Sequence, residues 1–195
     1  MELSKVFQGI GNIITLNDKE KNIFASLVDV TTVKRHELLL REGQRCNYEY
    51  FVINGCLRSY YLDENSIEHT TLFAVEGWWT GNLKSFVKNT PSEFHIQALE
   101  DTTVMRIPKS NIEELYAQVP KLERYFRILL QNRLLATQDR VSNHLSASAT
   151  TRYQQFTRRY PDLEKRVPAR HIASYLGITP TYLSRLRKKR WAGNL

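Results

Sequence analysis

The stretch that most constrains this chain is residues 169–189, where a glycine separates two short amphipathic patterns. Ile172 and Leu176 lie four residues apart, and with Ala173 they form one apolar helix face. Gly177 is suited to end that helix, because glycine enters the left-handed backbone region without a steric penalty. A first helix that stops at Gly177 is therefore predicted.

A second helix is predicted from Pro180. Thr179 is a suitable N-cap, and proline suits the first helical position because its missing N–H is not needed there. Leu183 and Leu186 lie three residues apart and would face the first helix. The two patterns together predict a helix-turn-helix, although an ordinary helical hairpin would share the apolar spacing. The side chains expected to face a partner are Arg170, Thr179, Thr181, Tyr182, Ser184, Arg185, Lys188 and Lys189.

Charge is divided unevenly along the chain and favours DNA as that partner. Residues 150–195 hold 11 Lys and Arg against 2 Asp and Glu, whereas residues 1–149 hold 17 against 18. The formal net charge of +8 therefore comes from the C-terminal segment. Basic residues clustered in a small module are typical of proteins that bind phosphate backbones. A membrane-surface helix would also be basic, but this segment has no broad apolar face for lipid.

Composition excludes several other classes. The 195 residues are 42% hydrophobic, which is enough for a globular core, and no apolar run could span a membrane. The first residues do not resemble a signal peptide, so we expect a cytoplasmic protein without membrane contact. Cys46 and Cys56 are too few for a disulfide scaffold or a four-thiolate cluster. We expect neither a cofactor nor a metal.

The segment from Val30 to Ile107 has the pattern of an all-β domain, preceded by a short helix. That helix is predicted because residues 17–20 have the spacing of a capping box. Runs rich in β-branched and aromatic residues then alternate with turn signals, which is typical of a sandwich, barrel or jelly roll. The strongest hairpin signal is Asn54-Gly55. The predicted strands include residues 38–40, 50–53, 57–62, 69–75, 94–99 and 102–107.

Helical patterns follow Pro108. Residues 110–113 have capping-box spacing, and a long helix is predicted from about Pro120. Its stripe could pair with the same helix of a second subunit or pack on its own domain. Small hydroxylated residues at 146–151 then suggest a hinge, followed by a helix over residues 152–160. The stripe consists of Leu122, Phe126, Leu130, Leu134, Val141 and Leu145.

In this order, these patterns resemble the Crp/Fnr family of bacterial transcription regulators over nearly the whole chain. The most specific segments are 42–44, 51–55, Gly81-Asn82-Leu83 and the helix-turn-helix. The resemblance implies an α+β fold with a jelly-roll-like β-roll (a double-stranded β-helix) over residues 1–119. A long dimerisation helix with a hinge would occupy residues 120–147, and a DNA-binding domain residues 148–195. It also implies a homodimer, a pseudo-palindromic operator and RNA polymerase as a further partner.

The cyclic-nucleotide site of that family is altered here. Where the family has Gly-Glu-Leu, this chain has an amide at Asn82, and Ser92 and Glu93 occupy the positions of the phosphate-binding Arg-Ser. Glu93 would repel a phosphate that arginine would bind, so cyclic AMP is not the expected ligand. Thr137 matches a base-facing residue. A pocket for another small effector, if one exists, would be lined by Trp79, Asn82, Leu83, Lys84, Glu93 and Thr137.

The recognition helix also departs from the family pattern. At the positions where members of the family often have Arg-Glu-Thr, this chain has Pro180, Thr181 and Tyr182. Arg185 matches an arginine that reads a base later in the family's recognition helix. We therefore expect a different operator that keeps a guanine contact through Arg185. The β-hairpin that usually follows the recognition helix is missing, which would leave the phosphates to residues 188–190.

Three alternatives stay open at this point. One is a regulator that binds DNA without an effector. Another is a haem sensor of this family, with ligands among His36, His69, His95 and His144, whereas the oxygen-sensing branch needs cysteines that this chain lacks. The third is a cupin-like metal enzyme, in which Glu93 and His95 would share a strand face, with His69 on an earlier strand.

Overall fold

The computed structural model describes residues 3–192 and forms two compact units. The first unit comprises Met1–Tyr61 and Leu72–Leu130, and the second Leu62–Thr71 and Gln131–Leu195. The strands are β1 (Asp29–Val33), β2 (Leu38–Leu40), β3 (Tyr48–Asn54), β4 (Leu57–Leu62), β5 (Glu68–Ala74), β6 (Trp79–Thr80), β7 (His95–Ala98) and β8 (Thr102–Pro108). The helices are α1 (Ser4–Gly11), α2 (Asp18–Ser26), α3 (Leu83–Lys88), η1 (Lys109–Asn111), α4 (Ile112–Gln118), α5 (Lys121–Ser146), α6 (Ala149–Arg159), α7 (Leu163–Arg166), α8 (Ala169–Leu176) and α9 (Pro180–Trp191).

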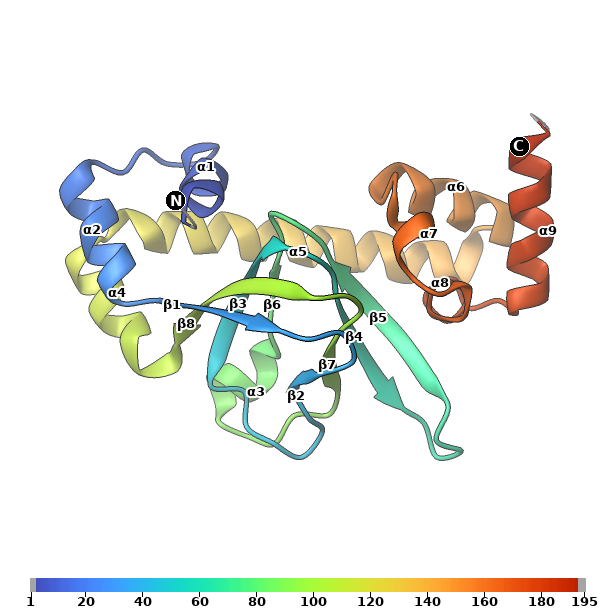
Figure 1. The fold of residues 1–195 in the computed structure, drawn as a ribbon, viewed down its shortest axis with the longest axis horizontal. Helices are drawn as coiled ribbons and strands as arrows, with labels where there is room; N and C mark the ends of the chain where they lie inside the picture. Colours follow the sequence, from blue (N-terminus) through green and yellow to red (C-terminus); the bar gives the residue numbers. More distant parts are fainter. Residues whose placement is uncertain (1–2, 193–195) are drawn as a thin grey trace. The chain divides into compact units, whose positions relative to one another are not determined.

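The strands form two four-stranded antiparallel sheets, with orders β1-β8-β3-β6 and β2-β7-β4-β5 (Figure 1). This arrangement confirms the predicted α+β fold with a jelly-roll-like β-roll. The sequence patterns do not predict helices α1, α3 and α7 or strands β1 and β6, all of which are short and carry weak local signals.

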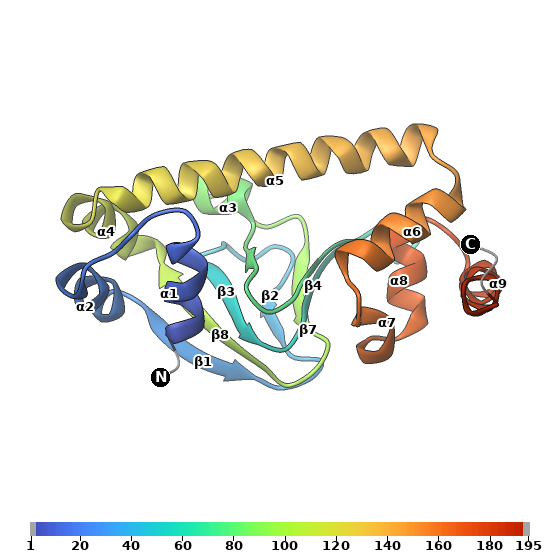
Figure 2. The same ribbon diagram turned by 90° about the horizontal axis from the view of Figure 1, so that it is seen from above.

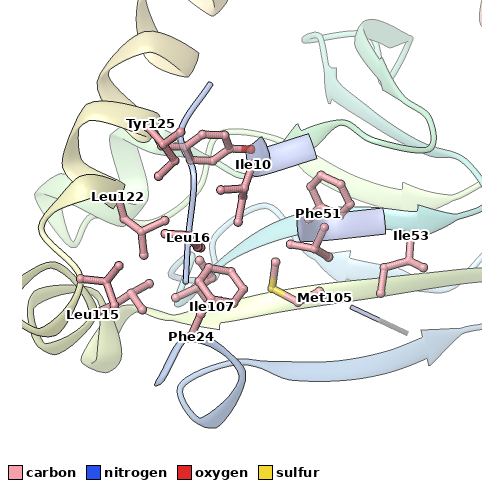
Figure 3. Packing of buried hydrophobic residues seen from close by; sticks show 13 residues of the cluster. Ile10, Leu16, Phe24, Phe51, Ile53, Met105, Ile107, Leu115, Leu122 and Tyr125 are labelled. Carbon is pink, nitrogen blue, oxygen red and sulfur yellow. The ribbon is translucent and has the colours of Figure 1, made fainter. Parts of the chain in front are cut away.

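Strand β3 is buried on both faces, which explains its continuous apolar run. Tyr50 and Val52 face the core between the two sheets, whereas Phe51 and Ile53 face the helices on the outer side. Figure 2 shows α1 beside β3 on that outer side. Figure 3 shows the same cluster, to which α2, α4 and the first turns of α5 contribute Phe24, Leu115, Leu122 and Tyr125.

One predicted capping box is confirmed and the other is wrong. The Asn17 side chain accepts from the Glu20 backbone N–H (2.9 Å), and the Glu20 carboxylate accepts from the Asn17 N–H (2.8 Å), at the start of α2. At residues 110–113, by contrast, η1 precedes α4, and no side chain caps Asn111. Instead, Ser110 Oγ donates to Asn111 Oδ1 (2.8 Å).

The hairpin predicted at Asn54-Gly55 is also wrong. The turn is present, with Gly55 at φ 102°, but β3 and β4 belong to different sheets. A Cβ on Gly55 would lie 2.5 Å from Thr102 Oγ1, so glycine is required both by the backbone angle and by this close approach. The turn therefore passes the chain from one sheet to the other.

The long helix predicted from about Pro120 is confirmed as α5. Its apolar stripe is buried near the start of the helix and exposed further along. Leu122 is buried and Phe126 partly buried in the helix-facing core of the first unit. Beyond them the stripe is exposed: the exposed fractions are 44% for Leu130, 59% for Leu134, 54% for Val141 and 85% for Leu145. Helix α5 ends at Ser146, and Ser148 caps α6 by accepting from the Thr151 N–H (3.1 Å).

Candidate nucleic-acid interface

The turn between α8 and α9 has the geometry that its sequence predicts. Gly177 ends α8 in the left-handed region at φ 66° and ψ 41°. The Ile178 N–H donates to the Ala173 carbonyl (3.0 Å), which closes the end of α8. Thr179 caps α9 by accepting from the Tyr182 N–H (3.2 Å), and Pro180 occupies the first turn. The α8–α9 pair is therefore a helix-turn-helix.

Helix α9 separates a buried side from a polar exposed side. Leu183 and Leu186 are buried, together with Ile172 and Leu176 of α8. At 100° per residue, the side opposite the two leucines collects the side chains predicted to face DNA. These are Thr181, Tyr182, Ser184, Arg185, Lys188 and Lys189, all of which are exposed. Thr179 at the N-cap and Arg170 near the start of α8 are exposed as well.

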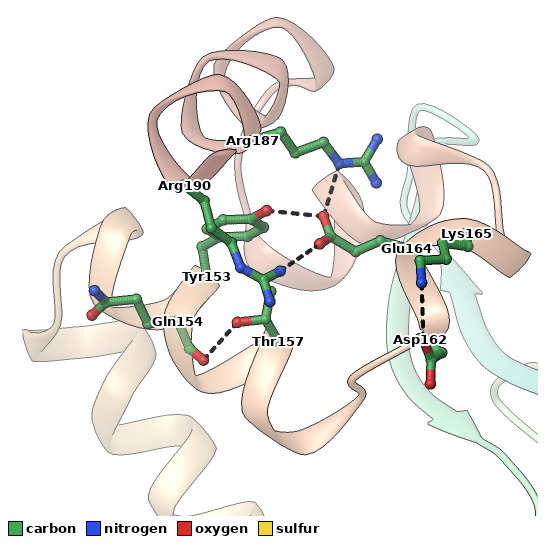
Figure 4. Close-up of polar contacts among 8 residues, drawn as sticks. All are labelled: Tyr153, Gln154, Thr157, Asp162, Glu164, Lys165, Arg187 and Arg190. Atoms are coloured by element: carbon green, nitrogen blue, oxygen red, sulfur yellow. Dashed lines mark hydrogen bonds and ion pairs between the residues drawn. The ribbon is translucent and has the colours of Figure 1, made fainter. Parts of the chain in front are cut away.

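The buried side of α9 is anchored by a carboxylate that the sequence analysis did not identify. Glu164 of α7 accepts from Arg187 Nε (2.8 Å) through one oxygen and from Arg190 (2.9 Å) through the other, as Figure 4 shows. Tyr153 of α6 donates its hydroxyl to the same carboxylate (3.0 Å). The side chain of Glu164 is only 14% exposed. This cluster fixes α9 against α6 and α7.

The cluster divides the basic residues of α9 by role. The sequence predicts phosphate contacts for Arg190 together with Lys188 and Lys189. In the structure Arg190 points to Glu164 on the buried side, whereas the two lysines lie on the exposed side. Much of the charge of Arg190 is therefore compensated within the protein, which favours the lysines as partners for phosphate.

Residues 62–71, the tip of the β4–β5 hairpin, belong to the same compact unit as α8. Ser174 Oγ accepts from the Thr70 N–H (2.9 Å) and donates to the Glu68 carbonyl (2.7 Å). Arg140 of α5 donates to the Thr70 carbonyl (3.2 Å) and to the Thr71 carbonyl. Ser174 of the first helix of the motif is thus bonded to backbone groups 104 and 106 positions earlier in the chain, and no sequence pattern identifies these contacts.

In the β-roll, the predicted effector-pocket residues are largely bonded to one another. The Asn82 oxygen caps α3 by accepting from the Ser85 N–H (3.1 Å), and its amide donates to Ser92 Oγ (2.8 Å). Lys84 forms an ion pair with Glu93. These contacts occupy the groups that correspond to the ribose and phosphate ligands of the resembled family.

The other predicted lining residues have surroundings of their own. Trp79 donates its indole N–H to the hydroxyl of Tyr125 (2.9 Å), and Leu83 is 40% exposed. Thr137 belongs to the second unit, where its hydroxyl donates to the Arg133 carbonyl (2.8 Å).

Two of the histidines proposed as ligands contact carboxylates, and one of these pairs is His95 with Glu42 (3.6 Å). His69 contacts Asp63 (2.8 Å), which together with backbone N–H donors lowers the pKa of that carboxyl. Glu93 lies outside β7, which begins at His95, so the shared strand face expected for a cupin-like site is wrong. Among residues 3–192 no group of three His, Cys, Asp or Glu is arranged to hold a metal ion. In the same range no helix combines the length and apolarity needed to cross a bilayer.

Comparison with known proteins places these features in a family context. Residues 30–119 match the cyclic nucleotide-binding domain. The anaerobic regulatory protein of Haemophilus influenzae is 26% identical over 187 residues, covering 88% of this chain and 71% of that protein. FixK2 from Bradyrhizobium japonicum superposes with a TM-score of 0.73 at 20% identity, covering 85% of this chain and 86% of the other. A Crp/Fnr-family transcriptional regulator from Eubacterium rectale has a TM-score of 0.69 at 19% identity, covering 91% and 85%.

Proposed function

Because this chain belongs to the Crp/Fnr family of transcription regulators, we propose that it reads a specific DNA site as a homodimer through α9. The observation that carries this proposal is the exposed polar and basic side of α9, opposite its buried leucines. A helix that presents such a side beyond a helix-turn-helix corner fits the major groove. Chromosomal DNA as the partner implies a cytoplasmic protein.

The side chains of α9 divide into base-reading and phosphate-binding groups. Arg185 lies near the middle of the exposed side and carries the fork of donors that matches a guanine edge. Thr181, Tyr182 and Ser184 supply shorter contacts around it. Lys188 and Lys189 contact phosphates, and the N-terminus of α9 at Thr179 offers backbone donors to another phosphate. Arg170 is placed to reach the backbone from α8.

Two copies pair through the exposed part of the α5 stripe. Leu134, Val141 and Leu145 leave apolar surface in water on a helix whose opposite side packs in its own unit. Pairing with the same stripe of a second subunit removes that surface from water. A two-fold dimer presents two recognition helices to half-sites about 34 Å apart, so the operator is a pseudo-palindrome.

The β-roll does not use cyclic AMP. Asn82 and Ser92 satisfy each other, and Glu93 adds negative charge where a phosphate would need a cation. Regulation therefore involves another effector or none. Whether the protein activates or represses, and whether it contacts RNA polymerase, follows from where its operator lies. The relatives are regulators rather than enzymes, and we assign no catalytic site.

Selection of binding sites from a random DNA pool tests the proposal. Wild-type protein at 150 mM salt should enrich a two-fold related sequence with a guanine in each half-site. An Arg185→Ala protein should lose the preference at that position while it still binds DNA, because the lysines remain. Enrichment of no sequence, or the same sequence in both proteins, would contradict the assignment.

A further inference from the structure

A cavity in the second unit lies away from the exposed side of α9 and is unused by the proposed function. It has a volume of about 690 Å³, within the usual range for small-molecule sites. Its walls come from the second half of α5, from α6 and from the end of α8. The lining side chains with chemistry to offer are Arg140, His144, Arg152, Arg158, Arg159 and Tyr175, with Asp139 as the single carboxylate.

Backbone carbonyls, rather than carboxylates, hold two of the four arginines that line this cavity. Arg152 donates to the Leu176 carbonyl (3.1 Å) and to the Ala147 carbonyl (2.7 Å). Arg140 donates to the Thr70 and Thr71 carbonyls and lies over the Tyr175 ring, 4.5 Å from its centroid. In the described part of the chain, neither they nor Arg158 has a carboxylate within ion-pair distance. Their positive charge is therefore oriented but not neutralised.

The His144 imidazole lies in the same cavity lining as these arginines. Partial burial, together with the charges of Arg140 and Arg152, lowers the pKa of the His144 imidazole. Its ring lies at the turn of the motif, because a Cβ on Gly177 would be 3.6 Å from His144 Cε1. Four arginines line this one cavity, and a nearby anion would relieve their mutual repulsion.

We propose that this cavity binds a small polyanion, a molecule with at least two negative charges on phosphate or carboxylate groups. Arginines whose forks are already oriented suit planar carboxylate and phosphate oxygens. The amides of Asn143 and Gln155 lie in the same lining, where Gln155 Nε2 donates to Asn143 Oδ1 (3.2 Å), and their remaining amide groups provide polar contacts for the rest of the molecule. A metal ion is disfavoured by the excess of positive charge.

The dimer leaves this cavity accessible. Asn143 lies two residues from Val141, which is about 200° around a helix, so the cavity side of α5 is opposite the apolar stripe. The exposed DNA-facing side chains of α9 are not part of the lining. The polyanion site is thus separate from both interfaces of the proposed function.

Binding of an anion in the cavity should affect the helix-turn-helix. Arg152 holds the last carbonyl of α8, Arg140 covers Tyr175, and His144 lies against Gly177. An anion that draws these side chains into the cavity changes how the end of α8 is held. This last step rests on the proposed function, whereas binding of the anion itself does not.

Calorimetry on the full chain, without DNA, tests the site with inorganic pyrophosphate and citrate as probes at 150 mM salt. We expect at least one probe to bind with a Kd below about 1 mM. Arg158→Gln removes a charge from an exposed lining residue whose side chain has no hydrogen bond or ion pair within the described residues, and should weaken binding about tenfold. Arg124→Gln, which removes a charge from an exposed position of α5 outside the cavity, is the matched control and should leave the Kd unchanged.

Nuclear magnetic resonance of His144 gives an independent reading. A bound anion should raise the pKa of this imidazole. Its charged or titratable neighbours in the cavity are Asp139 and Arg140 on α5, residues 152, 158 and 159 on α6, and Tyr175 on α8. Binding of pyrophosphate alone identifies a phosphate site, and binding of citrate alone a carboxylate site. Three results would each overturn the proposal: no binding of either probe, equal weakening of binding by the two substitutions, or a His144 pKa that the probe does not change. None of them would contradict DNA binding.

Discussion

Glu164 Oε1 lies 2.8 Å from Arg187 Nε, and this ion pair joins α7 to the recognition helix across 23 residues of sequence. The same carboxylate accepts from Arg190 and from the Tyr153 hydroxyl. One acidic side chain therefore positions α9 in a segment that is otherwise strongly basic. Without it, two arginines would face each other on the buried side of the helix.

Replacing Glu164 with glutamine should destabilise the second unit. Exposed ion pairs contribute about 0–1 kcal/mol and loss of one partner of a buried pair costs about 3–5 kcal/mol, so for this mostly buried side chain we expect a loss of about 2 kcal/mol. Urea denaturation followed by circular dichroism measures the change. Asp162→Asn is the matched control: its partner Lys165 is exposed, and the loss should stay below about 0.5 kcal/mol. Equal effects of the two substitutions would show that Glu164 does not hold α9.

Arg185→Ala and Lys189→Ala should affect DNA binding differently. Loss of a bidentate guanine contact should cost about 1–3 kcal/mol at the selected site and little elsewhere. Loss of a phosphate contact should weaken binding to every sequence and reduce the salt slope by about 1. Fluorescence anisotropy over a range of salt concentrations separates these cases, with Arg124→Ala as a control for net charge. Two mutants that bind like wild type would refute the α9 interface.

Val141→Glu or Leu134→Glu should convert the dimer to a monomer, because a charge would be buried in the helix seam. Sedimentation velocity at micromolar concentration measures the change. Val87→Glu is a suitable control, since Val87 is 65% exposed on α3 of the first unit, close to the 54% of Val141. A wild-type monomer at that concentration is incompatible with the proposed seam.

Cyclic AMP and cyclic GMP should not bind tightly. The phosphate would meet Glu93, and Asn82 would have to give up its bond to Ser92. Titration calorimetry should give no Kd below about 10 μM, equivalent to about −7 kcal/mol. Tighter binding would show that the β-roll keeps a nucleotide site despite these substitutions.

His144 should make stability depend on pH. Its pKa is lowered in the folded protein, so the folded state binds protons less readily than the unfolded state does. This contribution is present above the unfolded value of 6.5 and is lost as pH falls toward the folded value. The free energy of unfolding should therefore decrease from about pH 7 to pH 5.5, and less so in His144→Gln. An identical pH profile in the variant would contradict this account.

Local signals were enough for the elements whose stabilising contacts lie within a few residues. The Asn17–Glu20 capping box, the limits of β4 and the Gly177–Thr179 corner all depend on contacts between near neighbours, and the structure confirms them. Helix α5 could be predicted for the same reason, because its apolar residues recur at three- and four-residue steps. Hence the longer strands and helices, the helix-turn-helix and the side chains on its exposed face could be predicted from the sequence.

Tertiary structure decided the contacts between distant segments. Whether Asn54-Gly55 closes a hairpin depends on the strand partners, and β3 pairs with β8, about fifty residues away, rather than with β4. Glu164 meets Arg187, Ser174 meets Thr70, and the arginines of α5 and α6 share one cavity only after the helices pack. Such contacts leave no periodic trace in the chain, because each needs only one suitable side chain at each end and the fold alone sets the distance between them.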